Sequence, residues 1–389
     1  MRDPLSKKIT GIAPSGIRKF FDIVSEMPDA ISLGVGEPDF DTPWRVREEG
    51  IYTLEKGRTF YTSNAGLKEL RQEISNYLDR KIHVRYDYVH EVMVTVGGSE
   101  GIDLTMRAML NPGDEVLVPE PSYVSYAPCV TLADGVPVPI PMKEENEFKL
   151  TAEELEAAIT PKTKILVLPF PNNPTGEAIK KADLQAWVDF ANKNGAVIIY
   201  DAAYEAYITE AGIPHSIYEC EGAKTCAIEL RSFSKKAGFT GMRLGFAVIP
   251  KDLKSGDVSL NAMWMRRQGS KYNGTPYIIQ RAGEAVYSPE GKAQVAEQIA
   301  RYMKNAKTIY TGLKDAGFTV YGGVNSPYIW LKTPNDMKSW DFFDFLLNNA
   351  GIVGTPGAGF GPSGEGYFRI TAFGTYENSL KALDRIKNL

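Results

Sequence analysis

Two adjacent lysines follow an apolar, strand-like run in the second half of the chain. Lys235 and Lys236 lie in the stretch SFSKKAGFTGMRLGF, which comes after the run CAIELR, and Arg243 follows eight residues after Lys235. A lysine held in a partly dry pocket can lose its proton and become a nucleophile. The pair therefore contains a candidate nucleophile.

Groups that suit a phosphate occur in two places. Residues 97–99 (GGS) stand between an expected strand and an expected helix, where free N–H groups and the helix dipole favour an anion. Taken alone, a turn of this kind is an ordinary tight turn about half the time. Ser232, Ser234 and Arg243 add hydroxyl groups and a fixed positive charge. The sequence has neither a GxGxxG fingerprint nor a Walker P-loop, so we expect a phosphate that belongs to another kind of cofactor.

An acidic residue ends the strand-like run AVIIYD. Asp201 at the buried end of such a strand needs a partner, which is either a structural Arg or Lys or the protonated ring nitrogen of a cofactor. Tyr123 offers an aromatic face, while Asn173 and Tyr204 offer hydrogen bonds. With the lysine and the phosphate groups, this set meets the needs of pyridoxal 5′-phosphate. The ring of that cofactor acts as an electron sink while its nitrogen is protonated.

Short apolar runs bounded by Gly, Pro or Asn predict the strands that must hold these groups. The expected strands are EVMVTV (91–96), EVLVPE (115–120), KILVLPF (164–170), AVIIYD (196–201), CAIELR (226–231) and GFAVIP (245–250). Helical patterns lie between several of them, and Thr151 with Glu154 predicts a capping box. Alternating strands and helices indicate a mostly parallel α/β sheet, whose strands end at a common site.

Composition narrows the class of protein. The 389 residues are 43% hydrophobic and 24% charged with a net charge of -4, which predicts a globular protein with no nucleic-acid or membrane partner. The three cysteines and three histidines form no metal-ligand or disulfide pattern. We expect a cytoplasmic protein, because the sequence shows neither a signal-peptide core nor an apolar run of about 18 residues.

The chain resembles the class I/II aminotransferases, which are pyridoxal-phosphate enzymes of fold type I. SFSKKAGFTGMRLG is similar to the lysine signature of that family, and NNPTG and DAAY precede it in the expected order. The resemblance covers nearly the whole chain. It implies an α/β fold with a large, mostly parallel sheet domain and a smaller α+β domain. We expect residues 45–285 to form the large domain, and residues 1–44 and 286–389 the small one.

The resemblance also implies a role for each matching position in binding the cofactor. Lys235 would hold it through a Schiff base and move a proton between Cα and C4′, with Lys236 as a bystander. Asp201 would pair with the ring nitrogen, and Asn173 and Tyr204 would bond the phenolic oxygen. The ring would stack on Tyr123. The phosphate would be bound by Gly98, Ser99, Glu100, Ser232, Ser234 and Arg243, and by Tyr61 from a neighbouring subunit in a homodimer with shared sites.

The substrate site implied by the resemblance begins with Arg369, which would clamp the α-carboxylate, and Gly36, which would lie against it. Asn64, Asn325 and Tyr328 would line the side-chain pocket. Up to about Gly176 the chain resembles broad aspartate and aromatic aminotransferases, and from about residue 178 it resembles LL-diaminopimelate aminotransferases. The latter use an acid where this sequence has Asn64.

We expect the protein to transfer the amino group of acidic or aromatic L-amino acids to a 2-oxo acid such as 2-oxoglutarate. The scheme would be ping-pong, with weak activity on LL-diaminopimelate because Asn64 is neutral. An LL-diaminopimelate aminotransferase, a β-lyase on the same fold and a non-catalytic binding protein remain as alternatives.

Overall fold

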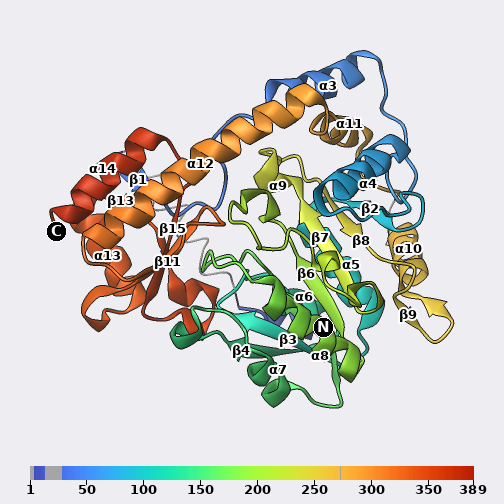
Figure 1. Ribbon diagram of the computed structural model, residues 1–389, viewed down its shortest axis with the longest axis horizontal. Coiled ribbons are helices and arrows are strands. Elements are labelled where there is room, and N and C mark those ends of the chain that lie inside the picture. Colours follow the sequence, from blue (N-terminus) through green and yellow to red (C-terminus); the bar gives the residue numbers. More distant parts are fainter. Residues whose placement is uncertain (1–3, 14–28, 272) are drawn as a thin grey trace.

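A seven-stranded sheet forms the centre of the computed structural model, which describes residues 4–13, 29–271 and 273–389 (Figure 1). The strand order is β2-β8-β7-β6-β5-β3-β4. The strands from β7 to β4 are parallel, whereas β8 runs antiparallel to both β7 and β2. This confirms the mostly parallel sheet. The strands are β2 Val92–Thr95, β3 Glu115–Glu120, β4 Val136–Pro141, β5 Thr163–Leu168, β6 Val197–Asp201, β7 Ala227–Ser232 and β8 Gly245–Val248.

The edge strand β4 is an element that the sequence analysis missed. Its sequence, VPVPIP, has a proline at every second position. In a strand, alternate N–H groups point to opposite sides, so the prolines lack only the N–H groups that would face away from β3. The residues that alternate with the prolines have N–H groups that face β3 and can pair with it. At the two ends of β4, the N–H groups of Val136 and Met142 donate to backbone carbonyls on the β3 side. Prolines placed in this way also prevent another chain from pairing with the edge.

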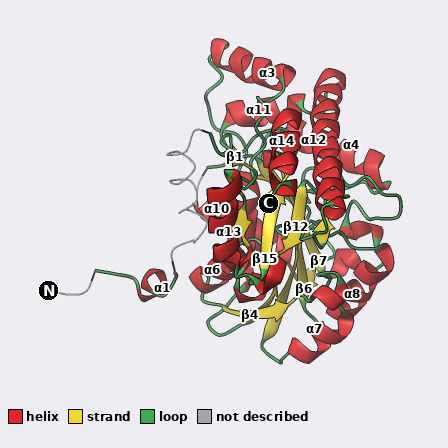
Figure 2. Cartoon of the chain, turned by 90° about the vertical axis from the view of Figure 1, so that its left-hand side faces the viewer, coloured by secondary structure: helices red, strands yellow, loops and turns green. Residues whose placement is uncertain are grey.

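Helices cover both faces of the sheet (Figure 2). Alternate strand residues point to opposite faces, so Leu166 and Leu168 join one core with α4 and α8, and Ile165 and Val167 join another with α5, α6 and α10. The predicted capping box of Thr151 and Glu154 starts α7 and is confirmed. The helices of this part are α3 Trp44–Glu55, α4 Lys68–Ile82, α5 Gly97–Met109, α6 Tyr126–Leu132, α7 Ala152–Ala158, α8 Lys181–Asn194, α9 Phe233–Lys236, α10 Leu260–Lys271 and α11 Tyr277–Ala285.

The C-terminal part has its own small antiparallel sheet, in the order β11-β12-β15-β14. Its core contains Ile31 and Leu33 of the N-terminal segment together with residues from 306 to 386. Figure 1 shows α12 running from this part toward α3 and α11. The elements are β1 Ile31–Ser32, α12 Pro289–Asp315, β11 Val320–Gly322, β12 Tyr328–Lys332, α13 Ser339–Ala350, β13 Ile352–Val353, β14 Thr355–Pro356, β15 Tyr367–Thr371 and α14 Tyr376–Lys387.

The division proposed from the sequence, with the large part at 45–285 and the small part at 1–44 and 286–389, stays a prediction. Part of the segment 1–44 lies outside the described residues. Short elements complete the chain: α1 Lys7–Thr10, η2 Glu144–Asn146, η3 Glu205–Tyr207, η4 Ile217–Glu219, η5 Ala223–Thr225, β9 Lys254–Ser255, β10 Val258–Ser259, η6 Pro334–Asp336, η7 Gly357–Phe360 and η8 Pro362–Gly364. Within the described ranges, no helix combines the length and apolar character that a membrane span needs.

Candidate active site

A cavity of about 450 Å³ lies beside the carboxyl ends of β5, β6 and β7, and β12 and β15 of the small sheet contribute to its wall. Segments that are far apart in the sequence therefore meet in one place, as expected for the edge of a parallel sheet. The cavity brings together thirteen of the residues that the sequence analysis selected. They are Gly36, Gly98, Ser99, Tyr123, Asn173, Asp201, Tyr204, Ser232, Ser234, Lys235, Arg243, Tyr328 and Arg369.

One end of the cavity suits an anion. The Arg243 guanidinium donates to the Thr240 carbonyl (2.7 Å) and to Ser234 Oγ (3.3 Å). It lies so close to the first residue of α5 that a Cβ on Gly97 would come within 2.5 Å of Arg243 Nη2, and Gly97 itself has φ +76°. Glycine is therefore required here by both space and backbone conformation. A fixed positive charge next to the N-terminus of a 13-residue helix is a strong phosphate site.

Asp201 lies at the end of β6 and forms no ion pair in the described chain. Tyr126 Oη donates to Asp201 Oδ2 (2.8 Å), and the Ala203 N–H donates to Oδ1 (3.1 Å). Burial raises the pKa of Asp201, although both hydrogen bonds oppose that shift. The alternative of a structural Arg or Lys partner is therefore not found among the described residues, and Asp201 keeps a carboxylate available for a cation in the cavity.

Lys235 is in the short helix α9 and reaches into the cavity. Its Nζ donates to the Gly36 carbonyl, which belongs to the N-terminal segment. Burial and the nearby charge of Arg369 lower the pKa of Lys235 to about 8, with a further lowering by Arg243 and an opposing effect of Glu37. Lys235 is thus mostly charged at neutral pH, but its neutral fraction is far larger than that of an ordinary lysine, and the neutral amine is the form that acts as a nucleophile or proton acceptor.

Arg369 extends from β15 and is only 4% exposed. Its guanidinium donates to Asn173 Oδ1 (2.7 Å), to the Gly34 carbonyl (2.6 Å) and to Thr355 Oγ1 (3.1 Å). These contacts hold the guanidinium plane in a fixed orientation, although Arg369 Nε has no hydrogen-bond partner in the described chain. A buried, oriented guanidinium is suited to bidentate binding of a carboxylate.

Two tyrosines connect Arg369 to the loop after β6. The Tyr328 ring lies 4.8 Å from the Arg369 guanidinium carbon, and the hydroxyls of Tyr204 and Tyr328 are 2.7 Å apart. Burial raises the pKa of Tyr204 and of Tyr328, so both hydroxyls are protonated at neutral pH. One of them donates to the other, which leaves one proton for a further partner. A donor at this position can bond an oxygen of a bound molecule.

Four of the selected residues do not line the cavity. Glu100 accepts from the Val96 N–H (2.6 Å) and pairs with Lys271 (2.7 Å). Tyr61 is 81% exposed. Asn64 lies near α10, since a Cβ on Gly269 would be 3.2 Å from its Nδ2. The roles of Tyr61 and Asn64 across a subunit interface stay predictions.

Asn325 is the fourth selected residue outside the cavity, and its role in the substrate pocket stays a prediction. Its Oδ1 accepts from the N–H groups of Thr209 (3.0 Å) and Glu210 (3.1 Å), and its Nδ2 donates to Glu210 Oε2 (2.7 Å). It lines a separate cavity of about 130 Å³. These bonds use the whole amide to fasten the loop after η3, so the side chain is not directed at the main cavity.

Three residues with polar side chains that line the cavity were missed by the sequence analysis. Tyr126 orients Asp201, Thr240 donates to Glu37, and Glu37 lines the cavity with its charge toward Lys235. Tyr126 stands three positions after Tyr123 in the segment PSYVSY, and its presence beside a selected aromatic residue could have been noticed. Nothing in the spacing of Glu37 or Thr240 distinguishes them from ordinary surface residues.

Comparison with known proteins gives consistent matches over almost the whole chain. The family described as aminotransferase class I and II matches residues 28–386. An LL-diaminopimelate aminotransferase of Agathobacter rectalis is 55% identical over 380 residues, which cover 93% of this chain and 92% of the relative.

Two solved structures illustrate the likeness in three dimensions. The LL-diaminopimelate aminotransferase from Chlamydomonas reinhardtii superposes with a TM-score of 0.90 at 32% identity, covering 100% of this chain and 99% of the other. The aromatic aminotransferase from Pyrococcus horikoshii OT3 superposes with a TM-score of 0.86 at 33% identity, covering 96% of this chain and 98% of the other.

Proposed function

Because the chain belongs to the class I and II aminotransferases, we propose that its amino donor is LL-diaminopimelate and its acceptor 2-oxoglutarate. The support is the 55% identity to a relative that carries that name over 93% of this chain. The broad enzyme for acidic or aromatic donors, which the sequence favoured, has weaker support. The aromatic aminotransferase that resembles this chain is only 33% identical.

The cofactor is pyridoxal 5′-phosphate, as the family implies. The residues present fit that group, since Asp201 is a partly buried carboxylate with no basic partner in the described chain and Arg243 packs against the Gly97 end of α5. We propose that Asp201 holds the ring nitrogen, that Tyr123 covers the ring, and that Arg243 and the α5 N-terminus hold the phosphate. When bound, the cofactor supplies an electron sink for the carbon next to the amino group.

The observation that carries the transferase proposal is that Lys235 and Arg369 face the same cavity as Asp201. In this proposal, Arg369 binds the donor's α-carboxylate in two hydrogen bonds and so fixes the direction of the Cα–H bond. Lys235, with a pKa of about 8, then removes the Cα proton. The linked hydroxyls of Tyr204 and Tyr328 offer a hydrogen-bond donor to a bound molecule beside Arg369.

We propose that Glu37 recognises the distal ammonium of the donor. A buried or half-buried ammonium needs a carboxylate or several good acceptors. Among the described residues that line the cavity, the acids are Asp201 and Glu37, and Asp201 is already bonded by Tyr126. Glu37 is bonded by Thr240 through one oxygen, which leaves the other oxygen for a ligand. Glu37 can thereby replace the acid that is absent at Asn64.

We propose that the protein is a homodimer whose interface includes the exposed aromatic and aliphatic side chains of α3 and the loop after it. Phe60 and Tyr61 are 62% and 81% exposed, and Trp44 and Leu54 are 55% and 54% exposed. Large apolar side chains gathered in this way are typical of an interface. Sedimentation of the holoenzyme gives its mass, and a monomeric active enzyme would exclude shared sites.

The donor proposal is tested by kcat/KM for LL-diaminopimelate, aspartate and tyrosine with 2-oxoglutarate. We expect LL-diaminopimelate to be preferred by at least about tenfold, and Glu37→Gln to reduce its advantage over aspartate by about tenfold, as for a lost charged hydrogen bond. Glu145→Gln, an acid outside the cavity, should leave the ratio unchanged.

Other results would favour the remaining candidates. A preference for aspartate or tyrosine would support the broad enzyme and would mean that Glu37 does not determine the choice of amino donor. Release of ammonia and a 2-oxo acid without any acceptor would identify a β-lyase. A protein that binds the cofactor but turns over none of these substrates would be a binding protein.

A further inference from the structure

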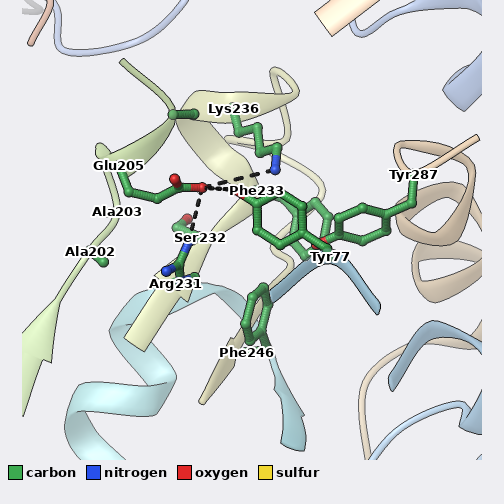
Figure 3. A pocket seen from close by; sticks show the side chains of 11 residues that line it. Tyr77, Ala202, Ala203, Glu205, Arg231, Ser232, Phe233, Lys236, Phe246 and Tyr287 are labelled. Carbon is green, nitrogen blue, oxygen red and sulfur yellow. Dashed lines mark hydrogen bonds and ion pairs between the residues drawn. The ribbon is translucent and has the colours of Figure 1, made fainter. Parts of the chain in front are cut away.

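A group of buried charges lies directly behind the cavity, on the other side of α9. It consists of Glu205, Glu229, Arg231 and Lys236, and we call it the buried charge cluster. Figure 3 shows Lys236 and Arg231 both pointing toward the carboxylate of Glu205, with aromatic rings on one side. The side chains of Glu205, Glu229 and Arg231 are 6%, 0% and 3% exposed, and that of Lys236 is 17% exposed.

Direct contacts join these four side chains. Arg231 pairs with Glu229 (Nε–Oε1, 2.6 Å) and with Glu205 (Nη1–Oε1, 3.0 Å). The Lys236 ammonium is 4.0 Å from Glu205 Oε1 and 3.8 Å from the centre of the Tyr77 ring. The Tyr77 hydroxyl also donates to Glu205. Lys236 is therefore held between a carboxylate and an aromatic face, both of which stabilise a cation.

The cluster is electrically balanced only when Lys236 is protonated. The carboxylates of Glu205 and Glu229 face the cations of Arg231 and Lys236. A further titratable group, the His215 ring, lies next to them, with Nδ1 3.4 Å from Glu205 Oε2. Burial lowers the pKa of Lys236 to about 8, opposed by Glu205, with Arg231, Lys81 and Arg80 acting in the same direction as burial. The ammonium is thus mostly charged at neutral pH. Without it, the cluster would hold a second carboxylate opposite a single arginine, and an uncompensated buried charge is strongly unfavourable.

Each member of this cluster except Glu229 is the immediate neighbour of a residue that lines the cavity. Lys236 follows Lys235, Glu205 follows Tyr204, and Arg231 precedes Ser232. The ion pairs therefore join the turn that carries Lys235 to the loop that carries Tyr204. The Tyr207 hydroxyl adds a parallel connection by donating to the Lys235 carbonyl (2.7 Å).

We propose that Lys236 is a positioning residue, whose ammonium, bound by Glu205 and Tyr77, fixes the Lys235 turn against the Tyr204 loop. This proposal differs from the expectation that Lys236 is a bystander. The inference rests on the assignment to the aminotransferases and on the proposed contact of Tyr204 with the cofactor, but not on the identity of the amino donor. A displacement of about 1 Å at a reacting group can reduce a rate by about a hundredfold, so even a partial loosening is measurable.

The test uses the holoenzyme variants Lys236→Met, Lys236→Arg and the double variant Glu205→Gln with Lys236→Met. Two quantities are measured: kcat/KM for the best donor, and the pH midpoint of the visible absorption of the bound cofactor. That midpoint reports the surroundings of the Lys235 nitrogen. We expect Lys236→Met to lower kcat/KM about tenfold and to raise the midpoint by about 0.5, because a looser Tyr204 no longer favours the unprotonated form.

The other variants separate positioning from simple stability. Lys236→Arg keeps the charge and should stay within about threefold of the wild type in kcat/KM. The double variant removes one charge of each sign, so it should recover the stability of the fold. It still lacks the contact between Lys236 and Glu205, so it should keep the lowered kcat/KM and the raised midpoint. Lys224→Met is the matched control, because Lys224 is exposed and faces only the Tyr86 ring at 5.2 Å.

Two results would overturn the proposal. One is a Lys236→Met holoenzyme with the wild-type midpoint and kcat/KM. The other is a double variant that folds and recovers the wild-type kcat/KM and midpoint although the contact between Lys236 and Glu205 is gone. If Lys236→Met does not fold, the double variant still decides, because its cluster is balanced in charge and is expected to fold without that contact. A normal cofactor spectrum without transamination in every variant would instead contradict the proposed function, whatever Lys236 does.

Discussion

Lys235 and Lys236 are neighbours in the sequence, and burial brings the pKa of each to about 8, yet their surroundings differ completely. Lys235 lines a cavity of about 450 Å³ with Arg369 and Arg243, and the Glu37 carboxylate opposes their effect on its pKa. Lys236 is packed among aromatic rings and is paired with Glu205. Equal proton affinity therefore does not imply equal function. The space in front of the nitrogen decides, because only Lys235 has room for a bound molecule.

The largest expected effect comes from removing each lysine in turn. Lys235→Ala should reduce kcat by about a thousandfold or more, since both the nucleophile and the proton acceptor are lost. Lys236→Met should reduce it only about tenfold. Steady-state rates of both variants, with cofactor content measured by absorption, check this. Comparable losses in the two variants would mean that the cavity and the buried charge cluster do not differ in function as described.

A smaller effect concerns the pH at which Lys235 loses its proton. The pKa of Lys235 is lowered from 10.5 to about 8, so the rate of cofactor incorporation into the apoenzyme should rise with pH and level off above about pH 8. Glu37 raises the pKa of Lys235, so Glu37→Gln should move the midpoint to lower pH. Glu205→Gln should move it much less, because Glu205 faces Lys236. Stopped-flow absorption gives these midpoints, and a midpoint near 10.5 would show that Lys235 is not perturbed.

The smallest effect on activity is expected at Asn325, which belongs neither to the main cavity nor to the buried charge cluster. Asn325→Ala leaves the N–H groups of Thr209 and Glu210 without their acceptor, so the free energy of unfolding should fall by about 1–2 kcal/mol. The kcat/KM should stay within about twofold, because the side chain does not line the main cavity. Thermal unfolding measures the change in stability, and steady-state kinetics with several donors measure the change in kcat/KM. A large change in donor preference without a loss of stability would show that Asn325 contacts the substrate.

Much of the fold and of the cofactor site could be predicted because both depend on local sequence patterns. Short apolar runs located six strands of the large sheet, and the groups after them converge at one edge, as the parallel topology requires. Strand β4 was missed because its three prolines imitate a loop, and only its pairing with β3 makes it a strand. Position at a sheet edge is a tertiary fact that local propensity does not contain.

The residues that were missed depend on contacts between distant segments. Glu37 faces Lys235 only because the N-terminal segment folds over the cavity, and the same packing brings the Gly36 carbonyl to the Lys235 Nζ. Glu205 and Lys236 are far apart in the sequence and are joined only by the fold. Asn325 lines another cavity although Tyr328 is close to it in sequence, because such proximity does not fix the direction of a side chain. Sequence spacing predicts neighbours along a strand, whereas pairings across the molecule require coordinates.

The antiparallel pairing of β7 with β8 has a consequence for how such sites are inherited and engineered. Ser232 is paired with Gly245, and the Phe233 N–H donates to the Leu244 carbonyl (3.0 Å), so residues 233–244 form a loop that is closed at its base. Lys235 and Arg243 both lie on this loop, and their separation depends on its length. The loop can therefore be exchanged as a unit. A loop of equal length transferred into a relative with these two strands brings both residues with it, whereas an insertion in the loop moves the lysine away from the arginine.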